Sequence, residues 1–312
     1  SHIGMKIFHH PGFAAPLGDH IMPISKFASV ADRIREEMLD IEIAAPESVG
    51  EVDLMRVHTP AYIKAVRTGE PRALAESQKF PWSPQLYPSV CLTNGGVLAA
   101  AREALRSGSS AALASGFHHA CADHGEGFCT FNGLVVALEA LREEGAIQRA
   151  AVLDLDLHYG NGTASLAADR PWLRALSIYG NDYWNNVPYR DVRERQHEDG
   201  PNHFSVPMIP SGASDRGVLL EALEKNLVWI LEGGRPDLLL YQAGADPLRD
   251  DPYSPLDLTH DDLMERDRVV FEFAKKNSIP MAWVLAGGYT KDIDKIVEVH
   301  VNTARAWVEI FS

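Results

Sequence analysis

The chain has 312 residues, of which 46% are hydrophobic and 23% are charged, and 29 basic against 43 acidic residues give a net charge of −14. This composition is typical of a folded globular protein and excludes a disordered, collagen-like or coiled-coil chain. Because the negative charge repels a phosphate backbone and no run of 18 apolar residues occurs, we expect neither direct nucleic-acid binding nor a membrane span.

The N-terminal residues and the cysteines indicate the cellular compartment of the protein. Cys91, Cys121 and Cys129 include no Cys-x-x-Cys pair, which favours a reducing compartment over a disulfide framework. The first residues lack the pattern of a signal peptide, so we expect a cytoplasmic protein. We expect residues 1–4 to be left over from cloning, with Met5 as the natural start.

Short apolar runs alternate with helical patterns along the chain. Some runs, such as Ala151–Leu153 and Leu238–Leu240, are apolar throughout, which is typical of strands buried on both faces of a parallel sheet. The predicted strands are Lys6–Phe8, Ile41–Ala44, Ser110–Ala114, Ala150–Asp156, Leu173–Ile178, Phe204–Val206, Asp237–Gln242 and Met281–Leu285.

Helical spacing of apolar residues fills the intervals between these strands. The pattern predicts one doubly wound α/β domain over residues 5–312, with a mostly parallel eight-stranded sheet and helices on both faces. Two irregular stretches, Lys79–Pro88 and Gly180–Asn202, are candidate functional loops. The predicted helices are Asp32–Leu39, Val97–Leu105, Gly133–Glu144, Val218–Leu231, Leu263–Lys276 and about Lys291–Ile310.

Polar residues follow four of the predicted strands. In doubly wound sheets the ligand site lies beyond the carboxyl ends of the strands, so these residues are candidates for one site. Each group stands beside glycines that permit sharp turns. The four segments are Ser115–His119, Asp154–Gly162, Gly244–Asp246 and Gly287–Tyr289.

The spacing of Asp154, Asp156 and His158 indicates a metal site. In an extended chain alternate Cα atoms are roughly 6.6 Å apart, so Asp156 and His158 can share one ion, whereas Asp154 and His158, roughly 13 Å apart, cannot. Asp246, at another strand end, is the best further ligand. Two carboxylates and one imidazole leave coordination open, which is the pattern of a catalytic zinc site.

These residues resemble the zinc-dependent histone deacetylase and acetylpolyamine amidohydrolase superfamily, and most of all the bacterial class IV histone deacetylases. The resemblance implies the arginase/deacetylase fold and covers nearly the whole chain in order. The matching segments are Ile7–Phe27, Gly116–Ala120, His124–Asn132, Asp154–Thr163, Gly244–Asp246, Glu265–Phe271 and Gly287–Tyr289.

The resemblance implies two kinds of metal site. Asp156, His158 and Asp246 would bind zinc, and Fe(II) stays open because an Asp₂His set binds several divalent ions. A structural potassium ion would lie at the backbone oxygens of Asp154, Asp156 and His158, together with Ser177 and Ile178.

The resemblance also implies a set of catalytic residues. His118 and His119 would flank the attacking water, with Asp154 holding His118 and Asn161 near His119. In this family the second histidine is usually the general base and then the general acid. Tyr289 would donate a hydrogen bond to the scissile carbonyl.

A narrow channel would hold the substrate in such an enzyme. The carbonyl of Gly127 would accept the substrate amide N–H, and Phe128 would line the channel. The loop after Gly180 aligns poorly with the family. The residue that forms the second channel wall is therefore either Tyr183 or Trp184.

The resulting hypothesis is a zinc-dependent deacylase acting on an acyl-lysine or an acylated polyamine. One alternative is an arginase-like ureohydrolase, which would use two metal ions. The other is a non-catalytic module that binds acyl-lysine. The acyl length and the oligomeric state stay open.

Overall fold

The computed structural model describes residues 4–14, 26–183, 197 and 199–312. Eight strands form one sheet in the order β2-β1-β3-β8-β7-β4-β5-β6, and all neighbouring strands among the described residues run parallel. The predicted fold class is therefore confirmed. The strands are β1 (Lys6–Phe8), β2 (Glu42–Ala44), β3 (Ser109–Ser115), β4 (Ala150–Asp154), β5 (Leu173–Tyr179), β6 (His203–Pro207), β7 (Leu238–Ala243) and β8 (Met281–Leu285).

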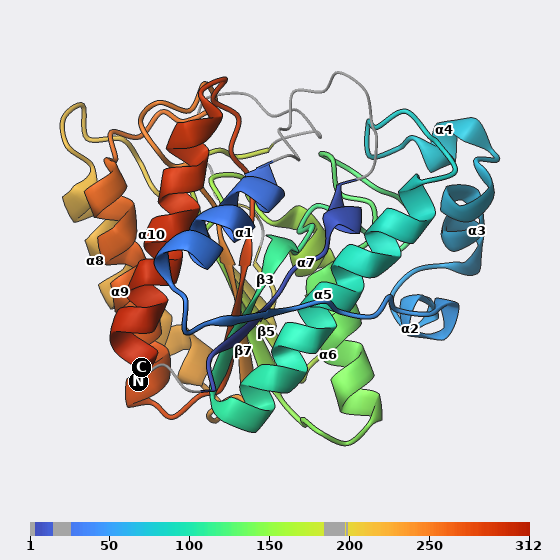
Figure 1. Cartoon of the computed structure of the whole chain (residues 1–312), viewed down its shortest axis with the longest axis horizontal. Coiled ribbons are helices and arrows are strands. Elements are labelled where there is room, and N and C mark those ends of the chain that lie inside the picture. Colours follow the sequence, from blue (N-terminus) through green and yellow to red (C-terminus); the bar gives the residue numbers. More distant parts are fainter. Residues whose placement is uncertain (1–3, 15–25, 184–196, 198) are drawn as a thin grey trace.

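Helices cover both faces of the sheet. In Figure 1 the helices α8, α9 and α10 stand on one side of the strands and α5, α6 and α7 on the other, and α1 packs beside α10. The α-helices are α1 (Lys26–Glu37), α2 (Glu51–Met55), α3 (Pro60–Thr68), α4 (Arg72–Ala75), α5 (Leu86–Ser107), α6 (Gly133–Glu143), α7 (Asn161–Ala167), α8 (Arg216–Asn226), α9 (His260–Lys276) and α10 (Ile293–Phe311). Within the part of the chain that the structure describes, the 3₁₀ helices are η1 (Pro11–Phe13) and η3 (Leu227–Leu231).

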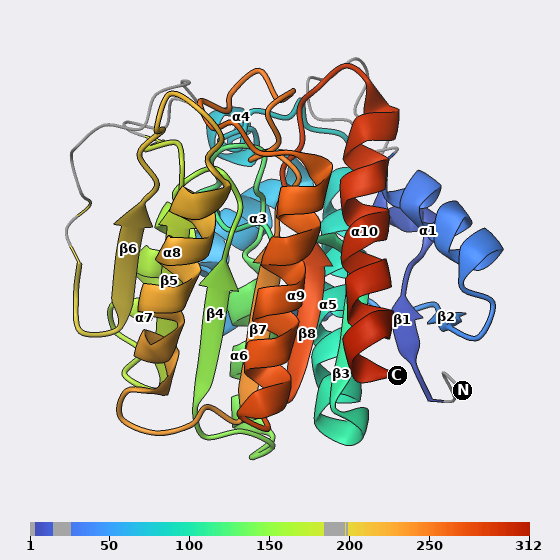
Figure 2. The same ribbon diagram turned by 90° about the vertical axis from the view of Figure 1, so that its left-hand side faces the viewer.

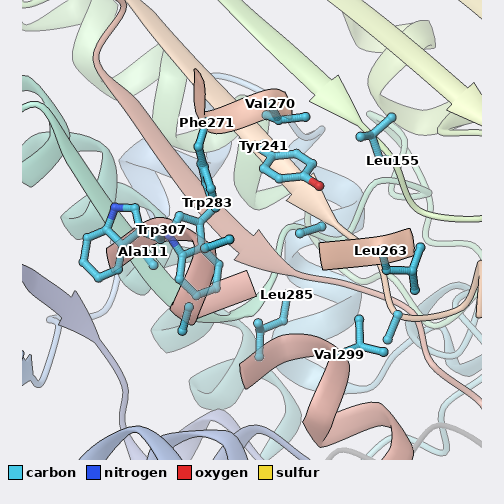
Figure 3. Packing of buried hydrophobic residues seen from close by; sticks show 14 of the residues in the cluster. Ala111, Leu155, Tyr241, Leu263, Val270, Phe271, Trp283, Leu285, Val299 and Trp307 are labelled. Carbon is cyan, nitrogen blue, oxygen red and sulfur yellow. The ribbon is translucent and has the colours of Figure 1, made fainter. Parts of the chain in front are cut away.

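Each central strand contributes to two hydrophobic cores, one on each face. Leu239 and Tyr241 of β7 belong to the core under α9 and α10, whereas Leu238 and Leu240 belong to the opposite core. Figure 3 shows the first core, where Trp283 of β8 lies among Tyr241, Phe271 and Trp307. Burial on both faces explains why these strands lack a polar alternation.

Some predicted boundaries are wrong. The strand predicted over Ala150–Asp156 ends at Asp154. Oδ1 of Asp154 accepts a hydrogen bond from the backbone N–H of Asp156 at 3.0 Å. This side-chain contact replaces the next hydrogen bond between the strands. The predicted irregular stretch Lys79–Pro88 runs into α5, which begins at Leu86.

The predicted helices also differ at their ends. α1 begins at Lys26 instead of Asp32, because Phe27 and Val30 extend its buried face. The pattern predicted over Val218–Leu231 is α8 followed by η3, and the Asn226 side chain bonds to the carbonyl of Ala222 where α8 ends. The sequence patterns missed α2, α3, α4 and α7 altogether.

The carboxyl ends of the parallel strands lie at the same end of the molecule, where a site can form. Figure 2 shows the arrowheads of β4 and β6 pointing to the same end of the molecule, where the connecting loops gather. Among the described residues, none of the helices has both the length and the apolarity of a membrane span.

Candidate active site

Residues that directly follow four adjacent strands meet at the carboxyl ends of these strands. The order β3-β8-β7-β4 makes neighbours of strands that are far apart in the chain. Because parallel strands end on the same edge, the segments that follow these strands come together. His118 and His119 follow β3, Tyr289 follows β8, Asp246 follows β7 and Asp156 follows β4.

The three predicted metal ligands lie together. One nitrogen or oxygen atom of each of Asp156, His158 and Asp246 lies within 4.8 Å of the others. Nδ1 of His158 is 3.3 Å from Oδ1 of Asp156 and 3.1 Å from Oδ2 of Asp246. The predicted extended geometry is wrong, however, because Asp156 and Leu157 form a bend beyond β4.

Backbone amides hold both carboxylates in this arrangement. Asp156 accepts hydrogen bonds at 2.8 Å from the N–H groups of His158 and Gly287, and Asp246 accepts one at 2.8 Å from Leu157. A Cβ atom at Gly287 would stand 2.3 Å from Oδ2 of Asp246. Only glycine therefore allows the backbone to approach the carboxylates this closely.

The electrostatics of this cluster fit a cation. Burial and the charge of Asp156 raise the pKa of Asp246 to about 6. Burial opposes a charge on His158, but its hydrogen bonds to Asp156 and Asp246 outweigh that effect and raise the pKa of His158 to about 10. Two carboxylates and an imidazole are a donor set that zinc and other divalent first-row metals accept. The residues present therefore fit a divalent metal ion.

The histidine pair has two different partners. Nδ1 of His118 lies 2.5 Å from a carboxylate oxygen of Asp154, whereas Nδ1 of His119 lies 2.6 Å from the amide oxygen of Asn161. Burial lowers the pKa of His118, but the charges of Asp154 and Asp156 and the hydrogen bond to Asp154 outweigh this effect and raise that pKa to about 9. For His119, burial and the neighbouring His118 lower the pKa well below its ordinary value. His118 is thus suited to carry a charge, whereas His119 stays neutral.

A pocket opens on this cluster. The ring of Tyr183 stacks on His119, with centroids 3.7 Å apart and planes 20° apart. Of the two residues predicted for the second channel wall, Tyr183 lines the pocket, and Trp184 lies outside the described residues. The pocket is lined by Lys79, His119, Gly127, Phe128, His158, Tyr183, Tyr253 and Tyr289.

A tight turn presents Gly127 and Phe128 to this pocket. Glu126 and Cys129 exchange backbone hydrogen bonds across the turn, at 3.3 and 2.7 Å. Gly127 has φ of +50° and Phe128 has φ of +69°, and positive φ at both central residues is typical of a type I′ turn. Because Phe128 is a bulky residue in this region, the turn is held by its surroundings.

We expect the Gly127→Ala variant to lose turnover while keeping its metal. The added Cβ would lie 2.5 Å from Oη of Tyr183 and 2.6 Å from Cδ2 of His119, so the stacked pair would be displaced. His119 is the predicted proton-transferring group, and moving such a group by an ångström costs roughly 100-fold in rate. Steady-state kinetics and metal analysis on one preparation measure both effects.

Gly145→Ala is the matched control for this variant. Gly145 also has a positive φ, of +75°, but nothing lies within 4 Å of its Cβ position. It carries the same backbone penalty without the collision. Equal losses of turnover in the two variants would contradict a steric role for Gly127.

Comparison with known proteins identifies the family. A family model described as the histone deacetylase domain matches residues 20–304. The chain belongs to the histone deacetylase family. It is 28% identical to histone deacetylase 2 of Arabidopsis thaliana over 86% of this chain and 68% of that protein. It is 26% identical to acetylpolyamine amidohydrolase 1 of Pseudomonas aeruginosa over 94% of both chains.

A solved structure supports the same fold. The crystal structure of the HDA15 HD domain matches with a TM-score of 0.78 at 20% identity, over 98% of this chain and 90% of that chain. The predicted family is confirmed, as is the predicted enzyme class, a hydrolase that acts on amides.

The sequence patterns missed several residues around this histone deacetylase-like site. Asp251 accepts a hydrogen bond from the N–H of Tyr289 at 2.8 Å, and the Tyr253 ring packs edge-on against Tyr289 at 5.2 Å. The buried Lys26 donates to the carbonyl of Ala286 at 2.5 Å, and burial lowers the pKa of Lys26 to about 8. These contacts join elements far apart in the chain, so no local pattern signals them.

The residues predicted for potassium lie beside the metal ligands. The register of β4 and β5 places Asp154 opposite Ser177, and Ile178 follows in β5. Oγ of Ser177 accepts a hydrogen bond from the N–H of Gly160 at 3.3 Å. The potassium site itself stays a prediction.

Proposed function

We propose that this protein is a zinc-dependent deacylase that hydrolyses the amide of an acyl-lysine or of an acylated polyamine. The observation that carries the proposal is that the cluster of Asp156, His158 and Asp246 adjoins the pair His118 and His119. One member of each group, His158 and His119, lines the same pocket. Family membership supports amide hydrolysis. The relatives named histone deacetylase and acetylpolyamine amidohydrolase support the two substrate classes.

The pocket suits an acylated amine on an alkyl chain. The aromatic rings of Phe128 and Tyr183 provide apolar contact for the methylene groups. The carbonyl of Gly127, which precedes Phe128 in the same turn, would accept the substrate amide N–H and align the scissile bond. Substrates without an N–H at this position are expected to react more slowly.

The chain's own residues would move the protons. When bound by Asp156, His158 and Asp246, zinc polarises the amide carbonyl and acidifies water. His119, whose pKa is lowered by burial and by the neighbouring His118, would take a proton from the attacking water and return it to the leaving amine. His118, charged beside Asp154, would stabilise negative charge, and Tyr289 would donate a hydrogen bond to the developing oxyanion.

Three further assignments belong to this proposal. Residues 5–312 form one catalytic domain. A potassium ion would be held by the backbone oxygens of Asp154, Asp156 and His158, together with Ser177 and Ile178. The enzyme works in the cytoplasm.

The proposal is tested by metal analysis and acetate release on the same preparation. The panel contains an acetyl-lysine peptide, longer acyl-lysines and acetylpolyamines, each offered to zinc-loaded, Fe(II)-loaded and chelator-treated protein. We expect one transition-metal ion per chain and acid release that chelation abolishes. Metal-replete protein that is inert on the whole panel, and no more active than Tyr289→Phe, would refute the deacylase.

The same measurements separate the alternatives. A transition-metal content near two ions per chain would favour the arginase-like ureohydrolase. Tight binding of an acylated peptide without turnover would favour the non-catalytic module.

A further inference from the structure

A chain of hydrogen bonds links His119 to a residue that the mechanism has not used. Nδ1 of His119 contacts Oδ1 of Asn161, and Nδ2 of Asn161 donates to Oε2 of Glu126. The other oxygen of Glu126 lies 3.3 Å from Nε2 of His124. The Glu126 side chain is only 16% exposed. A carboxylate is therefore held against the amide that orients His119.

Glu126, at the far end of this series of hydrogen bonds, determines which group donates and which accepts in each bond. A carboxylate accepts hydrogen bonds and does not donate them, so Glu126 requires the NH₂ group of Asn161 to face it. The amide oxygen of Asn161 must then face Nδ1 of His119. An amide oxygen also only accepts, so Nδ1 of neutral His119 carries the hydrogen and Nε2 keeps a free lone pair.

His118 needs no such third residue. Its Nδ1 contacts the carboxylate of Asp154 directly, and either carboxylate oxygen accepts a hydrogen bond. An asparagine amide, in contrast, can face a histidine with either its oxygen or its NH₂ group. With the NH₂ group toward His119, the hydrogen of the neutral imidazole would move to Nε2 and the base would be blocked.

We propose that Glu126 is a positioning residue for His119. It fixes the orientation of the Asn161 amide, and this orientation keeps the tautomer of His119 that can accept a proton at Nε2. The proposal rests on the deacylase function. Glu126 lies in the turn that also carries Gly127 and Phe128, so one local structure shapes the pocket and orients the base.

Glu126 also belongs to a second group that could hold a metal, together with Cys121 and His124. Both ring nitrogens of His124 face carboxylates, at 2.7 Å for Asp123 and 3.3 Å for Glu126. Burial raises the pKa of the Cys121 thiol to about 12, which disfavours the thiolate that a metal would bind. The hydrogen-bonded chain explains Glu126 better than a second metal does.

The test uses isosteric substitutions that exchange the donor and the acceptor of the hydrogen bond between positions 126 and 161. Glu126→Gln offers an amide in place of the carboxylate, so Asn161 is free to turn, and we expect kcat to fall roughly 10- to 100-fold with little change in KM. For comparison, a wrong histidine tautomer in a serine protease costs about 10⁴-fold. Asn161→Asp alone places two carboxylates side by side and is also expected to be impaired.

The double variant Glu126→Gln/Asn161→Asp is the decisive one. The carboxylate introduced at position 161 accepts from Nδ1 of His119 without needing orientation, and the amide introduced at position 126 donates to it. We expect kcat to return to within a few-fold of the wild-type value. Metal content should be the same in all four proteins. A purely structural role for Glu126 would give no such rescue.

The tautomer of His119 gives a readout that does not depend on activity. Imidazole ¹⁵N chemical shifts of the zinc-loaded protein should show Nδ1–H in the wild type and in the double variant, and a mixture in Glu126→Gln. A pure Nδ1–H tautomer in Glu126→Gln would overturn the inference, as would a double variant no better than Glu126→Gln. If the wild type is inert on every substrate but the tautomers behave as expected, the deacylase proposal fails and the positioning role stands.

Discussion

The Asp156→Ala variant is expected to purify with far less than one zinc ion per chain and to show no more turnover than chelator-treated wild type. Asp156 faces His158 and Asp246, and two backbone N–H groups fix its carboxylate. Its removal leaves two ligands, too few to retain the metal against a chelator. Elemental analysis and the acetate-release assay measure the two losses.

Thermal unfolding with and without zinc separates this effect from misfolding. A ligand that binds only the folded state stabilises it by about 4 kcal/mol at a concentration 1,000 times its Kd. We expect zinc to raise the melting temperature of the wild type and to have no such effect on Asp156→Ala or on the isosteric Asp156→Asn. Full zinc content with full activity in either variant would remove Asp156 from the ligand set.

Tyr289→Phe is expected to keep its zinc and to lose roughly 100- to 1,000-fold in kcat, the usual cost of removing one oxyanion donor. The phenol lies in the pocket wall, where burial raises the pKa of Tyr289 well above its ordinary value. The hydroxyl therefore stays protonated and able to donate. Because the hydrogen bond forms mainly as charge develops on the carbonyl oxygen, KM should change little.

Tyr87→Phe is the control for the loss of a phenol oxygen. Tyr87 packs against Phe131, outside the residues that line the pocket, so its variant should turn over substrate like the wild type. A rise in KM with undiminished kcat in Tyr289→Phe would show that Tyr289 contributes only uniform binding and does not selectively stabilise the transition state.

The strands were predictable because their signal is local. Runs such as Leu238–Leu240 are apolar whichever face they present, so they indicate a doubly covered strand without knowledge of its neighbours. The helices of residues 51–75 carry weaker signals. α3 has Thr59 as N-cap, Pro60 in its first turn and Gly69 at its end, yet it is short and was missed.

The candidate ligands were predictable in kind but not in geometry. The spacing of Asp156 and His158 suggested one extended face, whereas a bend after Asp154 brings them together. Side-chain bonds to nearby backbone N–H groups caused this bend, and they compete with the strand ladder in a way that residue spacing does not reveal.

By itself the sequence determined the eight strands, the alternation that makes a parallel α/β sheet, and the residue types that can bind a metal and move protons. Only the tertiary structure decided which strand ends adjoin, because the order β3-β8-β7-β4 depends on packing between distant segments. The family resemblance already implied Asp154 and Asn161 as partners of the two histidines, and only the tertiary structure shows Glu126 behind Asn161. His118 meets the carboxylate of Asp154, and His119 meets an amide whose orientation Glu126 sets. Hydrogen-bond polarity depends on such contacts in space, and no spacing along the chain encodes it.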